Sequence, residues 1–433
     1  METLTLLLFC AVLTLCVAMD ISIVYALIVG LIIFLTYGKL KKHSWSDLGK
    51  MVFSGIKTVR NILITFMLIG MLTASWRSAG TISTIICYAV TLIQPSIFVL
   101  VTFVLNSIIS VLTGTAFGTA ATMGVICMTM STAMQVNPLY AGGAILAGCF
   151  FGDRCSPVST SALLVSELTG TNLFTNLKKM VVSCLPGLAI TCVLYFLLGL
   201  SSQASGEIMD VEGLFSQHFN LHPLTVLPAV AVLVMAALRQ NVKKTLSVSI
   251  ILAVVCCVLF QGRPVDELLH TLVFGFQSAD PELGAMMNGG GITSMLRTAA
   301  IITISSSYSG IFQKTGLLEG AKQVIYALAQ RTTPYAATLA TAIVASVIAC
   351  NQTLSIMLTH QLCRDTQPEE ERFALTLEDT AVVVAPLVPW SIAGAVPLTT
   401  IGAPMTALLW TCFLYLLPIW QLAVQTVKKR KRK

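Results

Sequence analysis

Four short polar segments interrupt long apolar runs of this sequence, and they contain the side chains that could do chemistry. The first segment, 113–119, reads T-G-T-A-F-G-T. Glycine tolerates backbone conformations that break a helix, and a broken helix leaves carbonyl groups free to ligate a cation or a substrate. Thr113, Thr115 and Gly118 are therefore candidate binding residues, and a packing motif of small residues between helices is the alternative.

The second segment, 152–161, places Asp153, Arg154 and Pro157 between two apolar runs. A charge inside a membrane costs at least ~2.5 kcal/mol on insertion scales, so such residues usually have a function or pair with each other. We predict that Asp153 is the coupling carboxylate, which either binds Na⁺ or cycles a proton. The alternative is an Asp153–Arg154 pair at a helix end near the membrane interface. The hydroxyls predicted to join this site belong to Ser156, Ser159 and Thr160.

The third segment is the neutral polar triplet Asn351, Gln352 and Thr353, which lies between the apolar runs 334–350 and 354–359. Amide and hydroxyl groups can ligate a cation or form hydrogen bonds with a substrate. We therefore include all three side chains in the predicted ion- or substrate-binding set.

The fourth segment begins with Glu378 and Asp379 and continues through Pro386 and Pro389. Two prolines three residues apart prevent a continuous regular helix. We expect Glu378 to be structural, as part of a helix N-terminal cap near the membrane surface, whereas Asp379 is a candidate for the binding site. The other candidate site residues of this segment are Pro386, Trp390 and Ser391.

The composition places these segments in a membrane. Of 433 residues, 56% are hydrophobic and 10% are charged, and the mean hydropathy is +0.85. Soluble domains carry about 25% charged residues. A soluble enzyme, a nucleic-acid binder and a disordered protein are therefore excluded. The net charge of +7 is largely due to the six basic residues of the tail 428–433, which is typical of a cytoplasmic anchor.

The sequence contains no motif for an enzyme or for a bound cofactor. Thirteen cysteines lie mostly in apolar runs without a C-x-x-C pair, and no phosphate-binding loop occurs. Ser156 and Ser159 have no histidine on a nearby helical face that could act as a base. A channel would need a continuous pore lining, which two broken segments do not provide. We predict a transporter without a cofactor, with Na⁺, H⁺ or both as coupling ions.

Hydropathy predicts an all-α polytopic membrane protein, because a spanning helix needs about 20 apolar residues. About ten spans plus two re-entrant hairpins fit the pattern, and twelve spans are the alternative. The short run 80–93 is expected to be interfacial. The predicted spans are 2–18, 20–37, 61–76, 181–200, 223–237, 245–261, 295–312 and 403–427, and the interrupted segments are 95–133, 138–165, 334–363 and 376–401.

Loop charges predict the orientation, because cytoplasmic loops are rich in Lys and Arg. The basic segments 38–50, 178–179 and 239–244 should be cytoplasmic, together with both termini. The acidic loops 201–222 and 262–294 should be external.

The loop charges also suggest an inverted repeat. Loop 38–50 is basic, whereas its expected counterpart 262–294 is acidic, so the two halves should have opposite orientations in the membrane. We predict a first repeat over 1–200, an external linker over 201–222 and a second repeat over 223–433. The paired segments are 76–81 with 312–317 and 113–117 with 349–353, both at an offset of 236, and Asp153 and Pro157 with Asp379 and Pro386.

The motifs resemble the NhaC family of sodium/proton antiporters. The resemblance rests on G-D-R-x-S-P-V-S at 152–159, L-E-D-T…P-L-V-P-W-S-I-A-G at 377–394 and the segment 113–119, and it extends from about residue 60 to 420. It implies an inverted-repeat ion transporter of the bacterial cytoplasmic membrane, with a scaffold and a moving transport domain. Na⁺/H⁺ antiport is the leading function, and some members carry organic acids or amino acids.

The sequence departs from the family pattern at three site positions. Thr160 and Asn351 stand where the family has carboxylates, and Ser391 stands where it often has asparagine. Hard cations prefer oxygen ligands, so we predict a Na⁺ site formed by Asp153, Thr115 and Asn351. Fewer carboxylates leave room for a small organic solute as an alternative cargo. The other predicted partner is the lipid bilayer, and a homodimer is an open alternative.

Overall fold

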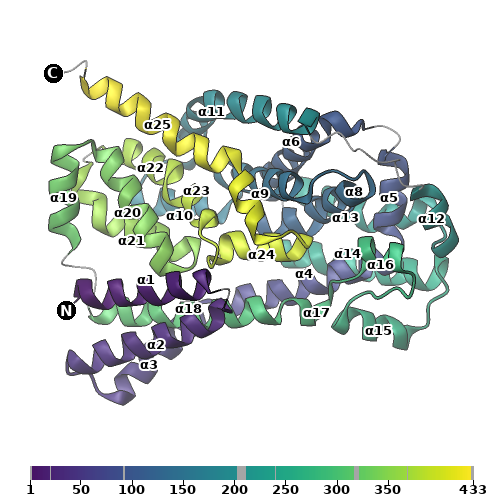
Figure 1. The fold of residues 1–433 in the computed structure, drawn as a ribbon, viewed down its shortest axis with the longest axis horizontal. Coiled ribbons are helices and arrows are strands. Elements are labelled where there is room, and N and C mark those ends of the chain that lie inside the picture. Colours follow the sequence, from purple (N-terminus) through teal and green to yellow (C-terminus); the bar gives the residue numbers. More distant parts are fainter. Residues whose placement is uncertain are drawn as a thin grey trace.

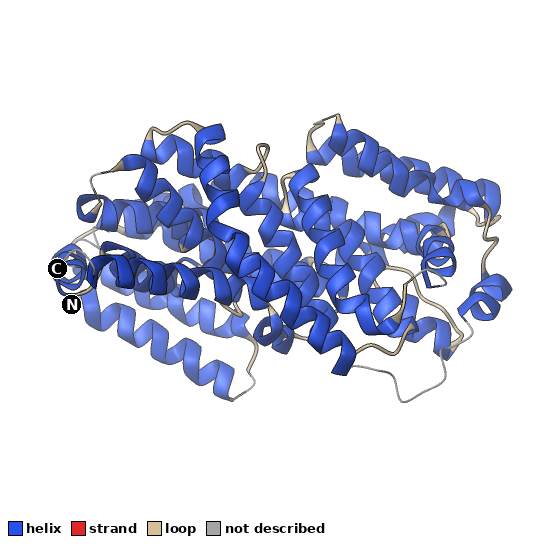
Figure 2. Ribbon diagram, turned by 90° about the horizontal axis from the view of Figure 1, so that it is seen from above, coloured by secondary structure: helices blue, strands red, loops and turns tan. Residues whose placement is uncertain are grey.

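The computed structural model describes residues 2–19, 21–90, 93–201, 211–238, 240–315, 321–367 and 369–430. The described chain is helical throughout, and its one extended contact is an isolated bridge between Phe276 and Gly289. Figure 1 shows that the start of α1 (Glu2–Ala18) and the end of α25 (Cys412–Arg430) lie at the same end of the long axis, and Figure 2 shows the same arrangement from above.

The first half of the chain forms eleven α-helices and one π-helical turn, counted over the described residues up to Ser201. After α1 these are α2 (Ile23–Leu40), α3 (Trp45–Thr58), α4 (Arg60–Ser78), α5 (Thr81–Val90), α6 (Pro95–Thr113), α7 (Ala116–Thr119), η1 (Ala120–Gly124), α8 (Val125–Ala133), α9 (Pro138–Cys155), α10 (Thr160–Thr169) and α11 (Leu173–Ser201).

The second half is more interrupted. Its elements before α25 are α12 (Val211–His218), η2 (Pro223–Val226), α13 (Leu227–Ala237), α14 (Val242–Phe260), α15 (Val265–Phe274), α16 (Pro281–Met287), α17 (Gly291–Ser294), α18 (Leu296–Thr315), α19 (Ala321–Arg331), α20 (Pro334–Ala349), α21 (Gln352–Cys363), η3 (Arg364–Thr366), α22 (Glu370–Asp379), α23 (Ala381–Val384), η4 (Ala385–Leu387), α24 (Ile392–Ile401) and η5 (Met405–Trp410).

Several helices are long and apolar enough to cross a bilayer. Among the described residues there are five, namely α2, α6, the run Ala116–Ala133, α11 and α14. Three bent helix pairs raise the number to eight if each pair is one span. The protein is therefore a polytopic helical membrane protein. The predicted count of ten spans with two hairpins, or twelve spans, stays a prediction.

Two segments expected to be loops are largely helical. In 38–50, α2 continues to Leu40 and α3 begins at Trp45, because the Ser44 hydroxyl accepts a hydrogen bond from the Asp47 backbone NH and caps the new helix. In 262–294, the chain forms α15, α16 and α17. In 201–222, residues 202–210 lie outside the described residues, and α12 follows them.

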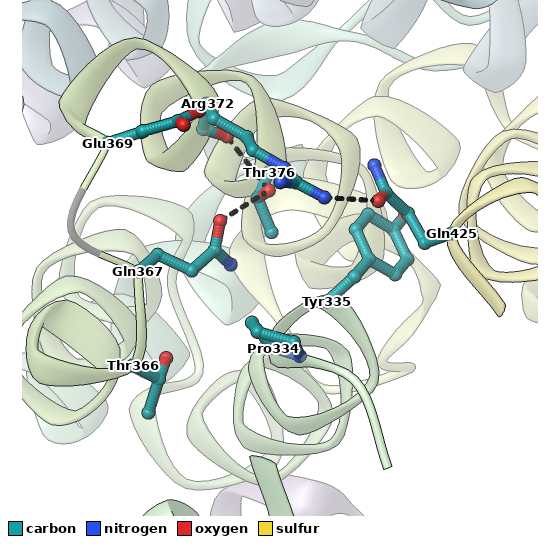
Figure 3. Close-up of a pocket in the computed structure, with 8 residues that line it drawn as sticks. All are labelled: Pro334, Tyr335, Thr366, Gln367, Glu369, Arg372, Thr376 and Gln425. Atoms are coloured by element: carbon teal, nitrogen blue, oxygen red, sulfur yellow. Dashed lines mark hydrogen bonds between the residues drawn. The ribbon is translucent and has the colours of Figure 1, made fainter. Parts of the chain in front are cut away.

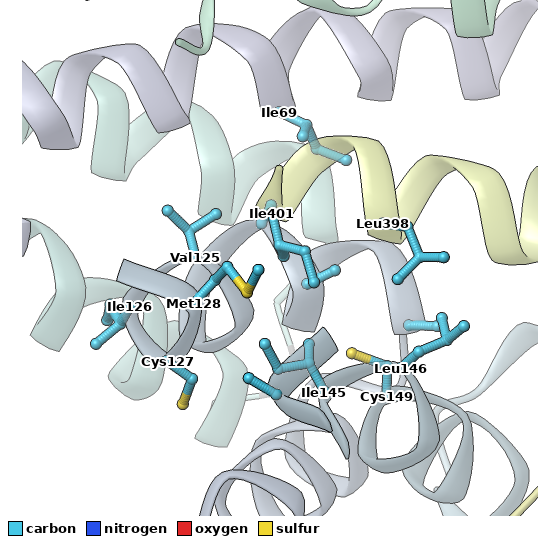
Figure 4. Packing of buried hydrophobic residues seen from close by; sticks show 14 of the residues in the cluster. Ile69, Val125, Ile126, Cys127, Met128, Ile145, Leu146, Cys149, Leu398 and Ile401 are labelled. Atoms are coloured by element: carbon cyan, nitrogen blue, oxygen red, sulfur yellow. The ribbon is translucent and has the colours of Figure 1, made fainter. Parts of the chain in front are cut away.

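The largest apolar core lies where α4, α8, α9 and α24 meet. Figure 4 shows Ile69 of α4, Val125 of α8, Ile145 of α9 and Ile401 of α24 around one cluster. A second core joins the N-terminal helices α1 to α3 with α18, α20 and α21. Burial of these side chains holds together elements that are far apart in sequence.

Close packing of α6 on α9 positions the polar segments. A Cβ atom on Gly148 would lie 2.7 Å from the Phe103 carbonyl oxygen, and one on Gly152 would lie 2.3 Å from the Ser110 carbonyl carbon. Only glycine permits the two backbones to approach this closely. The end of α9, with Asp153, is thereby held beside the end of α6.

Candidate functional site

The first helix break follows α6. Gly114 adopts a left-handed conformation with φ 66°, and Thr115 is extended and caps α7, with its hydroxyl accepting from the Gly118 NH at 3.4 Å. A Cβ on Gly114 would lie 2.8 Å from the backbone of Val158. The break in α6–α7 therefore packs directly on the break between α9 and α10.

The second helix break has the same backbone conformation 236 residues later. Cys350 is left-handed with φ 57°, and the extended Asn351 caps α21 by accepting from the Leu354 NH at 2.8 Å. A left-handed conformation is unusual for a residue with a Cβ atom. Thr115 and Asn351 thus occupy equivalent places, each at the start of a helix after a sharp reversal.

A second pair of breaks matches at an offset of 232 residues. The segments 156–159 and 388–391 share the pattern P-x-S, and Ser159 and Ser391 each cap the ten-residue helix that follows. Both of these helices, α10 and α24, end at a left-handed glycine, Gly170 and Gly402.

This backbone match corrects the residue pairing expected from the sequence. At an offset of 232 the counterpart of Asp153 is Ala385, and the counterpart of Pro157 is Pro389. The pairing of Asp153 with Asp379 and of Pro157 with Pro386 is therefore wrong in register. Similar residue types in apolar surroundings produced it, whereas the backbone dihedral angles distinguish the alignments.

Both helix breaks leave a carbonyl that receives a side-chain donor. The Ser156 hydroxyl donates to the Val111 carbonyl at 2.7 Å, and the Trp390 indole NH donates to the Val347 carbonyl at 2.9 Å. Backbone groups inside a membrane need partners because no bulk water is present. Ser156 and Trp390 therefore support the broken backbone, each in its own half of the chain.

Asp153 is buried at the end of α9, with 5% of its surface exposed, and its hydrogen-bond donors among the described residues are all uncharged. The Ser159 hydroxyl lies 3.1 Å from one carboxylate oxygen, and the Ser161 hydroxyl lies 2.9 Å from the other. The Gln352 amide reaches the same second oxygen at 3.1 Å and also donates to the Val382 carbonyl at 3.0 Å. Asp153 therefore connects the first half of the chain to the second.

Arg154 is paired with Asp379 rather than with Asp153. The guanidinium lies 2.5 Å from the Asp379 carboxylate, and both side chains are almost fully buried. The alternative of an Asp153–Arg154 pair near the interface is thus wrong. Direct contact between α9 and the end of α22 brings the two charges together across the halves.

Glu378 and Asp379 do not cap a helix N-terminus, as one interpretation of the sequence had it. They are the last two residues of α22, whose N-cap is Glu369, and 1% and 2% of their surfaces are exposed. One Glu378 carboxylate oxygen has no hydrogen-bond partner within the described structure. Glu378 is thus a buried acid adjacent to the Arg154–Asp379 pair.

A cavity of about 360 Å³ lies beside the first break. Thr113, Thr115, Gly118 and Thr160 all line it, so the structure brings together four of the predicted site residues. The opposite wall comes from α13, α14 and residues 240–241 between them. A volume of this order is suited to a small organic molecule.

The remaining predicted residues are more scattered. Thr353 is exposed, whereas Pro386 and Ser391 are buried at the second pair of breaks. The Thr115 and Asn351 side chains cap their own helices, and the hydrogen-bond partners of the Asp153 carboxylate are Ser159, Ser161 and Gln352. The predicted Na⁺ ligand set of Asp153, Thr115 and Asn351 stays a prediction. Among the described residues, no group of three or more His, Cys, Asp or Glu is arranged to hold a metal ion.

Sequence reasoning missed Ser161 and Lys243. The Ser161 hydroxyl contacts the Asp153 carboxylate. Its position two residues after the predicted site residue Ser159 could have indicated that it belongs to the same site. Lys243 lines the 360 Å³ cavity, but the sequence showed only a basic loop.

A smaller cavity, about 110 Å³, lies at the end of the molecule that holds the end of α25 (Figure 3). Arg372 donates to Gln425 of α25 at 2.6 Å, and Lys179 forms an exposed ion pair with Glu371. The start of α11 and the end of α25 thus both contact the first turn of α22.

Paired helix breaks, buried charges near them and an adjoining cavity in a polytopic helical protein are typical of a secondary transporter. The chain belongs to the Na⁺/H⁺ antiporter family, whose model matches residues 3–167 and 148–424. The resemblance to the NhaC antiporters is confirmed.

Three relatives show the range of this family. The Na⁺/H⁺ antiporter NhaC of Alkalihalophilus pseudofirmus is 28% identical over 404 residues, 90% of this chain and 87% of that protein. The malate-2H⁺/Na⁺-lactate antiporter of Bacillus subtilis is 28% identical over 394 residues, 88% of this chain and 84% of that protein. The arginine/ornithine antiporter ArcD of Halobacterium salinarum is 25% identical over 386 residues, 85% of this chain and 78% of that protein. These relatives are antiporters rather than enzymes, and the prediction of a secondary antiporter is confirmed.

Proposed function

We propose that this antiporter exchanges Na⁺ for H⁺ and that Asp153 is the coupling carboxylate. The observation that carries the proposal is a buried carboxylate whose hydrogen-bond donors, among the described residues, are all uncharged. Burial of an ionised carboxylate at this depth costs free energy unless its charge is compensated. Either a bound Na⁺ or a bound proton would compensate the charge of Asp153. One site that binds either cation, but not both together, couples their opposite movements.

The relation between the two halves supports an alternating-access mechanism. The left-handed breaks at Gly114 and Cys350 and the P-x-S breaks at 157–159 and 389–391 recur at nearly constant offsets. Two such repeats in opposite orientations, over 1–200 and 223–433, would let one rigid unit carry the site across the membrane. We propose an elevator movement of the helices that bear the breaks against a scaffold that includes α1 to α3 and α18.

Contacts between the loops support the proposed orientation. Lys179 and α25 both contact the first turn of α22, consistent with a cytoplasmic position for residues 178–179 and for the tail. The acidic loops 201–222 and 262–294 contact each other, because His218 lies 3.6 Å from Asp280. We propose the bacterial cytoplasmic membrane, with both termini on the cytoplasmic side.

A second candidate function is coupled transport of a small organic solute. The 360 Å³ cavity favours it, because that volume greatly exceeds what a dehydrated Na⁺ needs. The cavity opens beside residues 240–243, in the loop expected to be cytoplasmic, so the proposed state of the molecule is inward-facing.

The test is Na⁺-driven proton flux in proteoliposomes that contain Asp153→Asn. The amide keeps the shape of the side chain but neither binds a proton nor offers a negative charge to Na⁺. We expect normal insertion and a loss of exchange of at least about 100-fold, equivalent to ~2.7 kcal/mol. Glu167→Gln, which changes an exposed acid on α10, is the matched control and should exchange normally. Near-normal exchange by Asp153→Asn would refute the proposed role.

A further inference from the structure

The first turn of α14 contributes a positive charge to the 360 Å³ cavity. Lys243 is the one charged side chain among the described residues that line this cavity. Its ammonium donates to the side-chain oxygen of Asn61 at 3.0 Å, and its surface is half-buried. The amide of Asn61 is neutral, and no carboxylate among the described residues forms an ion pair with Lys243.

The position of Lys243 relative to the cavity is set by α4. Asn61 is one helical turn before Thr65, and Thr65 also lines the cavity. The ammonium therefore lies at the edge of the cavity beside the α13–α14 connection, while Thr113 and Thr115 lie at the helix break on the facing wall. A solute that binds here would contact a cation at one end of the cavity and threonine hydroxyl groups along its walls.

The rest of the lining restricts the chemistry of that solute. Threonine hydroxyls come from both sides of the cavity, and apolar side chains such as Val232 and Leu246 come from α13 and α14. The lining threonines are Thr65, Thr113, Thr115, Thr122, Thr160 and Thr245. No carboxylate belongs to the described lining. A carboxylate on the solute would pair with Lys243, whereas an ammonium on the solute would meet no counter-charge.

We infer that the cargo of this cavity is a small monocarboxylate with a hydroxyl or keto group on an apolar body, and that Lys243 binds its carboxylate. The inference rests on the organic-solute function proposed above and goes beyond it, because it selects a hydroxy or keto acid over an amino acid. An amino acid with a basic side chain is excluded most strongly, since it would bring two positive charges into a cavity that already holds one.

Three probes of equal size separate these classes. Lactate has the carboxylate and the hydroxyl, alanine replaces the hydroxyl with an ammonium group, and lactamide replaces the carboxylate with a neutral amide. Each is added to the purified full-length protein, and two quantities are measured: the shift in thermal unfolding temperature and the uptake of labelled solute into proteoliposomes. We expect lactate to raise the unfolding temperature and to be taken up, and alanine and lactamide to do neither.

The role of Lys243 is tested with a matched pair of variants. Lys243→Gln should raise the lactate concentration needed for half-maximal effect at least tenfold, whereas Lys244→Gln, at the exposed neighbouring position, should leave it unchanged. Lys243→Arg keeps the charge and should retain binding, which also separates loss of charge from loss of folding. Equal lactate responses in Lys243→Gln and Lys244→Gln, or equal responses of the unmodified protein to lactate and alanine, would overturn the inference.

Na⁺-driven proton flux, measured in the same liposomes, separates the two proposals. Flux that persists while none of the three probes binds or is transported would refute the cargo inference and leave Na⁺/H⁺ antiport intact. Absence of flux together with lactate uptake would instead refute plain Na⁺/H⁺ antiport and support the inference.

Discussion

At the scale of single residues, Gln352 makes Asp153 a site shared by both halves. Its amide is the donor to Asp153 that comes from the second half, and it also reaches the Val382 carbonyl. A movement of one half relative to the other would alter this contact and thereby the stabilisation of the carboxylate charge. In the proposed mechanism, Gln352 would couple ion occupancy at Asp153 to the positions of the two breaks.

Replacement of Gln352 by Leu should therefore weaken Na⁺ coupling. A hydrogen bond to a charged group contributes roughly 1.5–3 kcal/mol, which corresponds to about a 10- to 100-fold rise in the Na⁺ concentration for half-maximal flux. Gln361→Leu, at an exposed site on the same helix, is the control. An unchanged Na⁺ dependence in Gln352→Leu would show that the amide is a packing group.

The buried Arg154–Asp379 pair has a different energetic role. Loss of one partner leaves an uncompensated buried charge, so Asp379→Asn should lower the stability by about 3–5 kcal/mol. Glu371→Gln breaks the exposed Lys179–Glu371 pair and should change the stability by less than about 1 kcal/mol. Thermal unfolding in detergent measures both. Equal effects of the two substitutions on the unfolding temperature would mean that water reaches the Arg154 guanidinium and screens its charge.

At the scale of elements, contact between α6 and α9 controls where the breaks meet. Asp153 directly follows Gly152, whose missing side chain lets α9 touch Ser110 of α6. The Ser110 hydroxyl also donates to the Cys149 carbonyl, which adds a polar contact between the same two helices. A change of helix spacing here would therefore displace the carboxylate of the site.

We expect Gly152→Ala to destabilise the protein by about 1–3 kcal/mol, because its Cβ would lie 2.3 Å from Ser110. Gly49→Ala is the opposite case. Gly49 lies inside α3, and a Cβ atom added to it would have no other atom within 4 Å, so alanine should stabilise α3 by up to about 1 kcal/mol. The unfolding temperatures of the two variants should move in opposite directions, and a shift of the same sign would contradict the packing argument.

At the scale of the whole molecule, the direction of the chain through the membrane follows from charge. The basic segment 38–50 contains the exposed Ser44, and the acidic loop 201–222 contains the exposed Ser216 on α12. From the cytoplasmic retention of basic segments we expect the two serines to lie on opposite sides of the membrane.

The test is cysteine labelling from outside the cell in a background without native thiols. Ser216→Cys should react with a membrane-impermeant reagent, and Ser44→Cys should react only after the membrane is permeabilised. External labelling of Ser44→Cys would contradict the inverted orientation of the two halves, whatever the cargo is.

Local features of the sequence predicted the class of protein, most of the helices and the positions of the breaks. Apolar length and the backbone properties of glycine and proline act locally, so 113–119 and 152–161 were recognisable without a structure. The family motifs lie in the same segments and led to the antiporter assignment.

The contacts between polar groups, in contrast, depend on how the helices pack and could not be read from the sequence. Arg154 could have paired with its neighbour Asp153, and only the packing of α9 against the end of α22 selected Asp379. Gln352 and Lys243 are 199 and 90 residues from Asp153 in sequence, and no local pattern indicates that one contacts it while the other lines the adjacent cavity. The physical reason is that a helix break redirects the chain, so side-chain partners depend on long-range packing rather than on sequence spacing.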